Sequence, residues 1–146
     1  MKNALFLALL TSSILFSCGY VEPEPEIPTL EKDKNITFEF YTDKDYSSSQ
    51  YDTYFVNLNV GVSLVDKNTA QEIKIVEETT GWIPFKDIPY ELNKMKFWKL
   101  VPVDINRYKV SYGYFHQVKI GETIQMKAFG KFLEKWEDEK LITIKF

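Results

Sequence analysis

The residue types most often used in catalysis are scarce in this chain, which has one cysteine, Cys18, and one histidine, His116. A catalytic dyad or a zinc site built on His116 would need partner residues that no motif marks. Ser47, Ser48 and Ser49 lie in a polar stretch without the Gly-x-Ser-x-Gly pattern that presents a nucleophilic serine. We therefore expect no catalytic site and interpret His116 as a structural residue at a strand end.

Carboxylates offer two further kinds of chemistry. Residues 43–47 (DKDYS) resemble the opening of a calcium-binding loop, but Ser48 stands where that loop needs glycine and Tyr54 where it needs glutamate. The acidic residues at 77–78 and 137–139 are of the type that serves as acid and base in glycosidases, although charged residues at turns are usually only solvated. The sequence predicts no metal site and no cofactor.

The N-terminus carries Lys2 followed by the apolar run 4–16 (ALFLALLTSSILF), which is shorter than the ~20 residues that span a bilayer. This pattern predicts a secretion signal over residues 1–17. The alternative is an uncleaved helix over residues 4–21.

The sequence Leu15-Phe16-Ser17-Cys18 resembles the lipobox of bacterial lipoproteins. The resemblance implies diacylglycerol transfer to the Cys18 sulfur, cleavage before Cys18, and acylation of the new amino group; a thiolate is the nucleophile that such a transfer needs. Because each buried CH₂ contributes about 0.8 kcal/mol, two or three acyl chains give a stable membrane anchor. The expected location is the cell envelope, at the outer membrane.

Residues 18–34 are expected to form a tether. Glu22, Glu24 and Glu26 alternate with prolines, which favours extended polyproline II. At ~3.1 Å per residue this segment reaches up to about 50 Å from the lipid. In some bacteria acidic residues after the lipidated cysteine direct export, so display on the cell surface and a periplasmic location both stay open.

The bulk composition limits the partners and the sources of stability. The formal net charge is −3, and removal of the leader, whose only charged residue is Lys2, makes it −4. No basic run stands out in the sequence, so we expect neither nucleic acid nor anionic lipid headgroups as partners. A single cysteine excludes a disulfide within the chain. The aromatic fraction of 16% favours strands.

Hydrophobic alternation predicts the strands. Residues 53–65 (TYFVNLNVGVSLV) place Val56, Leu58, Val60, Val62 and Leu64 on one face. Turn-forming residues at 66–69 and renewed alternation at 72–77 complete a predicted hairpin. Further strands are expected near residues 36–41, 95–103, 107–115, 123–129, 131–136 and 141–146.

About eight strands over 129 mature residues predict one all-β domain from 35 to 146, an antiparallel β-sandwich, with a small closed β-barrel as the alternative. Residues 108–114 (YKVSYGY) resemble the penultimate strands of bacterial surface sandwich domains, which implies immunoglobulin-like or transthyretin-like character. Two segments stay open. The spacing of apolar residues in 129–136 also fits a short helix, and two prolines in 81–90 predict an irregular loop.

Aromatic side chains are the candidate binding residues. Tyr108, Tyr112 and Tyr114 share one strand face, where exposed rings would stack on sugars or peptides. We favour the other interpretation, that they fill the core, because it explains the rings without a ligand, and both stay open. The loop carrying Trp82, Phe85 and Tyr90 is our first choice for a binding loop, since functional residues concentrate on loops held by rigid scaffolds.

The sequence thus predicts a membrane-anchored, non-enzymatic binding or assembly module that contacts an envelope protein or a glycan. One alternative is a structural subunit of an outer-membrane complex, joined through an apolar strand edge at 141–146. Another is a small-ligand carrier, because Gly81-Trp82 is similar to the glycine and tryptophan of the first lipocalin strand, although here the pair lies in mid-chain.

Overall fold

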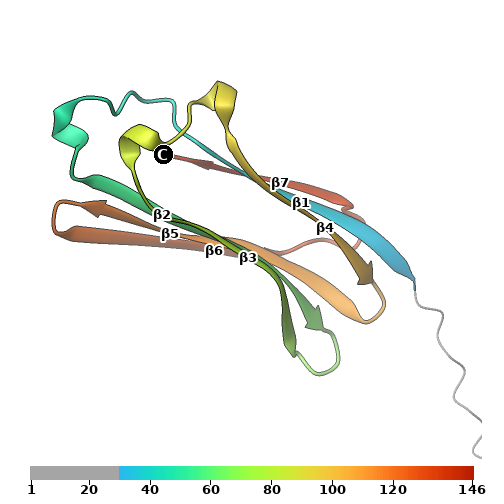
Figure 1. Cartoon of the computed structure of the whole chain (residues 1–146). Helices are drawn as coiled ribbons and strands as arrows, with labels where there is room; N and C mark the ends of the chain where they lie inside the picture. Colours follow the sequence, from blue (N-terminus) through green and yellow to red (C-terminus); the bar gives the residue numbers. More distant parts are fainter. Residues whose placement is uncertain (1–29) are drawn as a thin grey trace, which may run out of the picture.

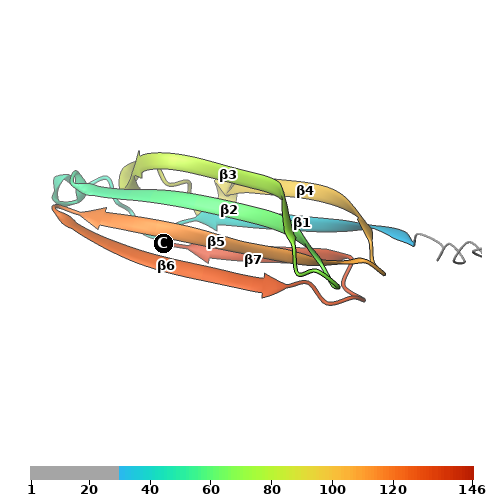
Figure 2. The same ribbon diagram turned by 90° about the horizontal axis from the view of Figure 1, so that it is seen from below.

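The computed structural model describes residues 30–146, which form two β-sheets packed face to face (Figure 1). The three-stranded sheet has the order β4 (Met95–Asp104), β1 (Glu31–Tyr41), β7 (Glu139–Lys145). The four-stranded sheet has the order β3 (Glu72–Pro84), β2 (Tyr54–Asp66), β5 (Tyr108–Ile120), β6 (Thr123–Phe132) (Figure 2). Three short 3₁₀ helices complete the fold: η1 (Ser49–Tyr51), η2 (Phe85–Asp87) and η3 (Glu91–Asn93).

The predicted all-β sandwich is confirmed, with seven strands in the described part of the chain rather than about eight. The two sheets do not close into a barrel, so the barrel alternative is wrong. Apolar side chains from both sheets fill the space between them, which removes the central cavity that a lipocalin-like carrier requires.

The predicted hairpin is β2 and β3, and it shows how the sequence pattern directs the fold. The alternating apolar residues of β2 are all buried, namely Val56, Leu58, Val60, Val62 and Leu64, whereas Ile73 and Ile75 of β3 are exposed. At the turn, one carboxylate oxygen of Asp66 accepts hydrogen bonds from the backbone N–H groups of Asn68 (2.9 Å) and Thr69 (3.1 Å). In the turn, the Asp66 side chain therefore accepts the backbone hydrogen bonds that a neighbouring strand would accept within the sheet.

Both sheets contribute side chains to the core, and in the sequence the buried core residues run from Ile36 to Ile144. Ile36, Phe38 and Phe40 of β1 alternate toward β2 and β5, because every second residue of a strand faces the same side. Residues 30–146, the part that the structure describes, therefore contain a hydrophobic core to which both sheets contribute.

The two ends of the sandwich are closed differently. The aromatic end is a chain of edge-to-face ring contacts among Tyr46, Tyr51, Tyr54, Phe85 and Phe146. At the opposite end, which we call the lysine end, β1 begins, and Lys34 is only 2% exposed. The Lys34 Nζ donates to the carbonyl oxygens of Lys135 (3.0 Å) and Glu137 (2.6 Å) and to the Asp138 carboxylate (2.7 Å).

Strand boundaries differ from the prediction in three places. β1 starts at Glu31, which pairs with Asp104, so the sheet begins within the segment assigned to the tether. β3 continues through Gly81 to Pro84, and the irregular segment starts only after it. A proline has no N–H group to donate. Pro84 is tolerated because β3 is an edge strand, whose outward-pointing N–H groups have no partner strand.

The third difference concerns residues 129–136. β6 ends at Phe132, and residues 133–138 form neither the expected strand nor the alternative helix. Leu133 is buried there, and Lys34 holds the carbonyls that follow it. The loop crosses from one sheet to the other, so β7 starts at the lysine end and runs parallel to β1, whereas the other four strand pairings are antiparallel as expected.

The predicted leader, Cys18 and residues 18–29 of the predicted tether lie outside the described residues. Among residues 30–146, no helix has the length and apolar character needed to cross a membrane.

Candidate functional site

Three glycines stand in one row across the four-stranded sheet. Gly61 of β2 pairs with Gly113 of β5, which in turn pairs with Gly130 of β6. The neighbouring residues Val60 and Tyr112 belong to the core, so the glycines lie on the opposite, outer face of the sheet. Three missing side chains leave a shallow depression there, which we call the glycine furrow.

The fold requires only one of these glycines. A Cβ at Gly113 would clash with the carbonyl oxygen of Phe129, because β6 approaches β5 closely at this point. A Cβ at Gly61 would lie 3.6 Å from its nearest neighbour and one at Gly130 would lie 4.0 Å away, both of which are comfortable distances. Neither residue has a left-handed backbone, which in the described residues is found among glycines only at Gly81 and Gly121.

Gly61 and Gly130 therefore lower the stability of the sheet without a packing reason. A glycine in a strand costs about 0.5–1 kcal/mol relative to alanine, and β-branched residues suit such positions better still. A glycine in mid-strand that no backbone contact requires is typical of a place where another molecule approaches the sheet closely.

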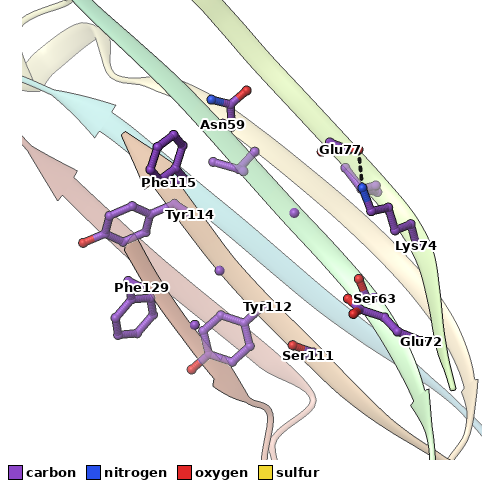
Figure 3. A pocket seen from close by; sticks show the side chains of 15 residues that line it. Asn59, Ser63, Glu72, Lys74, Glu77, Ser111, Tyr112, Tyr114, Phe115 and Phe129 are labelled. Atoms are coloured by element: carbon purple, nitrogen blue, oxygen red, sulfur yellow. Dashed lines mark hydrogen bonds and ion pairs between the residues drawn. The ribbon is translucent and has the colours of Figure 1, made fainter. Parts of the chain in front are cut away.

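The furrow forms a pocket of about 300 Å³ on the sheet (Figure 3). Asn59 and Phe115, which are register partners on β2 and β5, stand toward one end of the furrow. Ser63 and Ser111, also register partners, stand toward the other end. On the outer face, the pocket thus combines the ring of Phe115 with amide and hydroxyl groups.

The polar groups at the furrow are available, and two of its three charged residues form an ion pair. Within residues 30–146, the side chains of Asn59, Ser63 and Ser111 make no hydrogen bond. On β3, the Lys74 ammonium and the Glu77 carboxylate form an exposed ion pair at 2.9 Å, and this hydrogen bond raises the pKa of Lys74. Glu72 also lines the pocket and is not part of this ion pair, so the furrow presents hydrogen-bonding groups together with one excess negative charge.

The polar surface extends along the same face toward Trp82. The Thr79 hydroxyl donates to the Asn57 Oδ1 at 3.0 Å, and the Asn57 Nδ2 donates to the Gln117 Oε1 at 3.4 Å. Trp82, opposite Asn57 in the register, is 45% exposed. A line of fixed amides thus leads from the furrow to an indole ring.

The structure separates the three residues of the predicted binding loop. Trp82 lies on β3, on the outer face of the four-stranded sheet. Phe85 is buried within the aromatic end, so it serves the core and cannot contact a ligand there. Tyr90 is half-exposed and follows η2, and its backbone bridges to Thr42. Of the three, only Trp82 shares a face with the glycine furrow.

The predicted aromatic face of β5 points into the sandwich. Tyr112 is buried, and Tyr108 and Tyr114 are partly buried against the core. The ring of Tyr114 stacks on Phe129, with centroids 5.3 Å apart. The structure thus places these tyrosines as core-filling residues, which was one of the two interpretations left open.

His116 lies in the middle of β5 rather than at a strand end. Its ring stacks on Tyr114 (5.8 Å) and contacts Phe146 (4.9 Å), and its buried Nδ1 has no hydrogen-bond partner within residues 30–146. Burial lowers the pKa of His116, and the nearby charge of Lys127 lowers it further. The surroundings keep this ring neutral without orienting it as a general base.

The acidic residues considered as ligands or acids are engaged in local contacts. Asp43 pairs with Lys145 at 2.5 Å, and Asp45 accepts a hydrogen bond from the Ser47 backbone at 2.8 Å. The Lys145 hydrogen bond lowers the pKa of Asp43. In the described part of the chain, no three His, Cys, Asp or Glu side chains gather as a metal site would require.

The sequence carried a signal for the furrow, because Gly61 and Gly113 each take an outward-facing position within an alternating strand, where a glycine marks a bulge or a close approach. That the glycines align depends on the register of three strands, and the sequence alone does not give the register. Comparisons with protein-family models, with curated proteins and with solved structures found no match for this chain.

Proposed function

We propose that this protein is a lipid-anchored envelope protein whose sandwich binds an uncharged glycan chain across the glycine furrow, without catalysing a reaction. The observation that supports this most is that Gly61 and Gly130 weaken the sheet although the fold does not need them. A bound chain explains why both positions lack side chains.

The chemistry of the furrow favours a sugar. The hydroxyls of a sugar match the free amide and hydroxyl groups of Asn59, Ser63 and Ser111, and its C–H faces match the rings of Phe115 and Trp82. Lys74 and Glu77 pair with each other, and the remaining carboxylate of Glu72 disfavours an anionic ligand. The furrow runs across three neighbouring strands, so an extended polymer can follow it from β2 to β6.

The anchor is the second part of the proposal. It is supported by the lipobox-like sequence that ends at Cys18 and by the apolar run before it. Labelling with palmitate in the native host tests it, because wild type should carry the label and the Cys18→Ala variant should not. Equal labelling of the two proteins would exclude the anchor while leaving the glycan site untested by that result.

Glycan-array binding by soluble residues 19–146 tests the furrow. The double variant Gly61→Thr and Gly130→Thr fills the depression with side chains that the sheet accepts, so its melting temperature should equal or exceed that of wild type. Its affinity for the bound glycan should fall at least about tenfold. Lys119→Thr places a threonine elsewhere on the same face of β5 and should leave binding unchanged.

Two results would overturn the furrow as the binding site. One is undiminished glycan binding by the Gly61→Thr, Gly130→Thr variant. The other is an equal loss caused by Lys119→Thr, which would place the contact outside the furrow.

A specific surface favours a protein partner as a second candidate. On the outer face of the three-stranded sheet, Thr37 pairs with Trp98 on one side and with Leu141 on the other. Trp98 is 70% exposed, Leu141 and Leu100 are also exposed, and the buried Oδ1 of Asn35 beside them has no partner in the described residues. Such a patch suits an assembly contact made from β7 and β4.

Co-purification from envelope extracts distinguishes the two candidates. A stoichiometric protein that is lost with Trp98→Ser and retained with Gly61→Thr, Gly130→Thr would establish the assembly role.

A further inference from the structure

A second cavity, of about 400 Å³, opens at the lysine end of the sandwich. Its floor is made of core side chains from β4, β5 and the loops beside them: Val103, Ile105, Val110 and Leu133. The half-exposed ring of Phe132 forms part of its wall. The cavity is thus apolar inside and lies at the edge of the core.

Four lysines from four different segments surround this apolar floor: Lys34, Lys67, Lys109 and Lys135. Lys34 is neutralised by Asp138. Within residues 30–146, none of the other three has a carboxylate within 4.0 Å. Glu134 is the single acidic residue that lines the cavity, so the rim carries a local positive excess in a chain whose net charge is −3.

Contacts hold the Lys67 ammonium at the loop beside the floor and the Lys109 ammonium against the Phe132 ring of the wall. The Lys67 Nζ donates to the carbonyl oxygens of Ile105 (2.5 Å) and Asn106 (3.1 Å), which lie on the loop between β4 and β5. The Lys109 Nζ stands 5.8 Å from the centroid of the Phe132 ring, within the range of a cation–π contact. Neither contact removes the positive charge, which stays available to an anion.

We propose that this cavity binds a fatty-acid anion, with the acyl chain on the apolar floor and the carboxylate among Lys67, Lys109 and Lys135. The volume lies within the range of about 300–1,000 Å³ typical of small-molecule sites. A carboxylate placed there gains charge-assisted hydrogen bonds, while the chain buries apolar surface. The combination excludes cationic amphiphiles, which the lysines repel, and small inorganic anions, which leave the floor uncovered.

The position of the cavity agrees with this ligand. The backbone N–H of Ile105 donates to the carbonyl oxygen of Leu30 at 3.3 Å, so the N-terminal strand enters the sandwich beside the cavity floor. If Cys18 carries the anchor, the chain that leads to the membrane leaves the body at this end. The fatty-acid site does not depend on the glycine furrow, which lies on the outer sheet face.

Isothermal titration calorimetry of soluble residues 19–146 with dodecanoate, below its micelle-forming concentration, tests the site. We expect saturable binding with one site per chain. The variant Lys109→Gln, Lys135→Gln should raise the dissociation constant for dodecanoate at least about tenfold. It should not disturb the fold, because both side chains are exposed. The cationic amphiphile dodecyltrimethylammonium should not bind.

The matched control is Lys119→Gln, Lys127→Gln, which removes the same charge from exposed positions on β5 and β6 that do not line the cavity. It should bind dodecanoate as wild type does. Equal weakening by the control, equal affinity for the cationic amphiphile, or no saturable binding by folded wild type would each overturn the proposal. The Gly61→Thr, Gly130→Thr variant should keep dodecanoate binding, so failure of one site is distinguishable from failure of the other.

Discussion

The aromatic end and the lysine end close the same sandwich by opposite means. At the aromatic end, rings pack edge to face, as between Tyr46 and Phe85 at 4.8 Å, and this ring packing covers most of the core. At the lysine end, the buried ammonium of Lys34 satisfies two carbonyls and a carboxylate, and an apolar cavity is left beside it.

The difference shows which end is free to take a ligand. The ring cluster fills its space, so the aromatic end contributes mainly stability. The lysine end is fixed by directional hydrogen bonds, which hold the loop 133–138 while leaving room and charge next to it. The following four predictions test this contrast, from the largest expected effect to the smallest.

The largest effect is expected at the aromatic end. Phe85→Ala removes a buried ring that contacts Tyr46, Tyr54 and Phe146, so the free energy of unfolding should fall by about 3–5 kcal/mol. Urea denaturation measures this change. Tyr90→Ala, a half-exposed ring on the same connection, is the control and should cost less than about 1 kcal/mol. Comparable losses from the two variants would show that Phe85 is not a core residue.

At the lysine end, Lys34→Met keeps the size of the side chain and removes its donors. The carbonyls of Lys135 and Glu137 then lose a partner, and the free energy of unfolding should fall by about 2–3 kcal/mol. Lys32→Met, at an exposed position on the same strand, should change it by less than about 0.5 kcal/mol. A variant as stable as wild type would mean that packing, and not the ammonium, closes this end.

Acid should weaken the lysine end through Asp66. Its carboxylate accepts hydrogen bonds from Arg107 and from the Thr69 and Asn68 backbone, which together lower its pKa to about 2 from the ordinary 3.8. A lowered native pKa gives stability that is complete above the ordinary pKa and is lost as the pH falls from 3.8 toward 2. The stability gap between wild type and Asp66→Asn, measured by urea denaturation, should therefore be constant above pH 5 and narrow below pH 4. A gap that does not depend on pH would contradict the ion pair.

The smallest of the four effects is expected at the aromatic end, where the stability should depend on pH near neutrality because of His116. Burial beside Tyr114 and Phe146, together with the Lys127 charge, holds its native pKa below the ordinary 6.5, so the unfolded chain takes up the proton first. Thermal unfolding temperatures should fall between about pH 7 and pH 5 in wild type and stay level in His116→Phe. The same decline in both proteins would assign it to other groups.

The sequence by itself determined the strands and the class of the fold. The alternation from Val56 to Leu64 specifies a half-buried strand wherever the chain goes, because successive side chains of a strand point to opposite faces. The aromatic residues of β5 were equally visible, but the sequence did not show whether Tyr112 faces a core or a ligand. That choice depends on which sheet face is covered.

Tertiary structure alone decided the two sites and the closure of the ends. Gly61, Gly113 and Gly130 are far apart in the chain, and only strand register, set by side chains on the buried face, places them in one row. From the sequence, Lys34 was assigned to the tether. In the structure it belongs to β1, which pairs with β4 and β7, and its ammonium bonds to the loop at 133–138. Alternation along a strand is a local property, whereas neighbours across strands and between sheets exist only once the sheets have formed and packed.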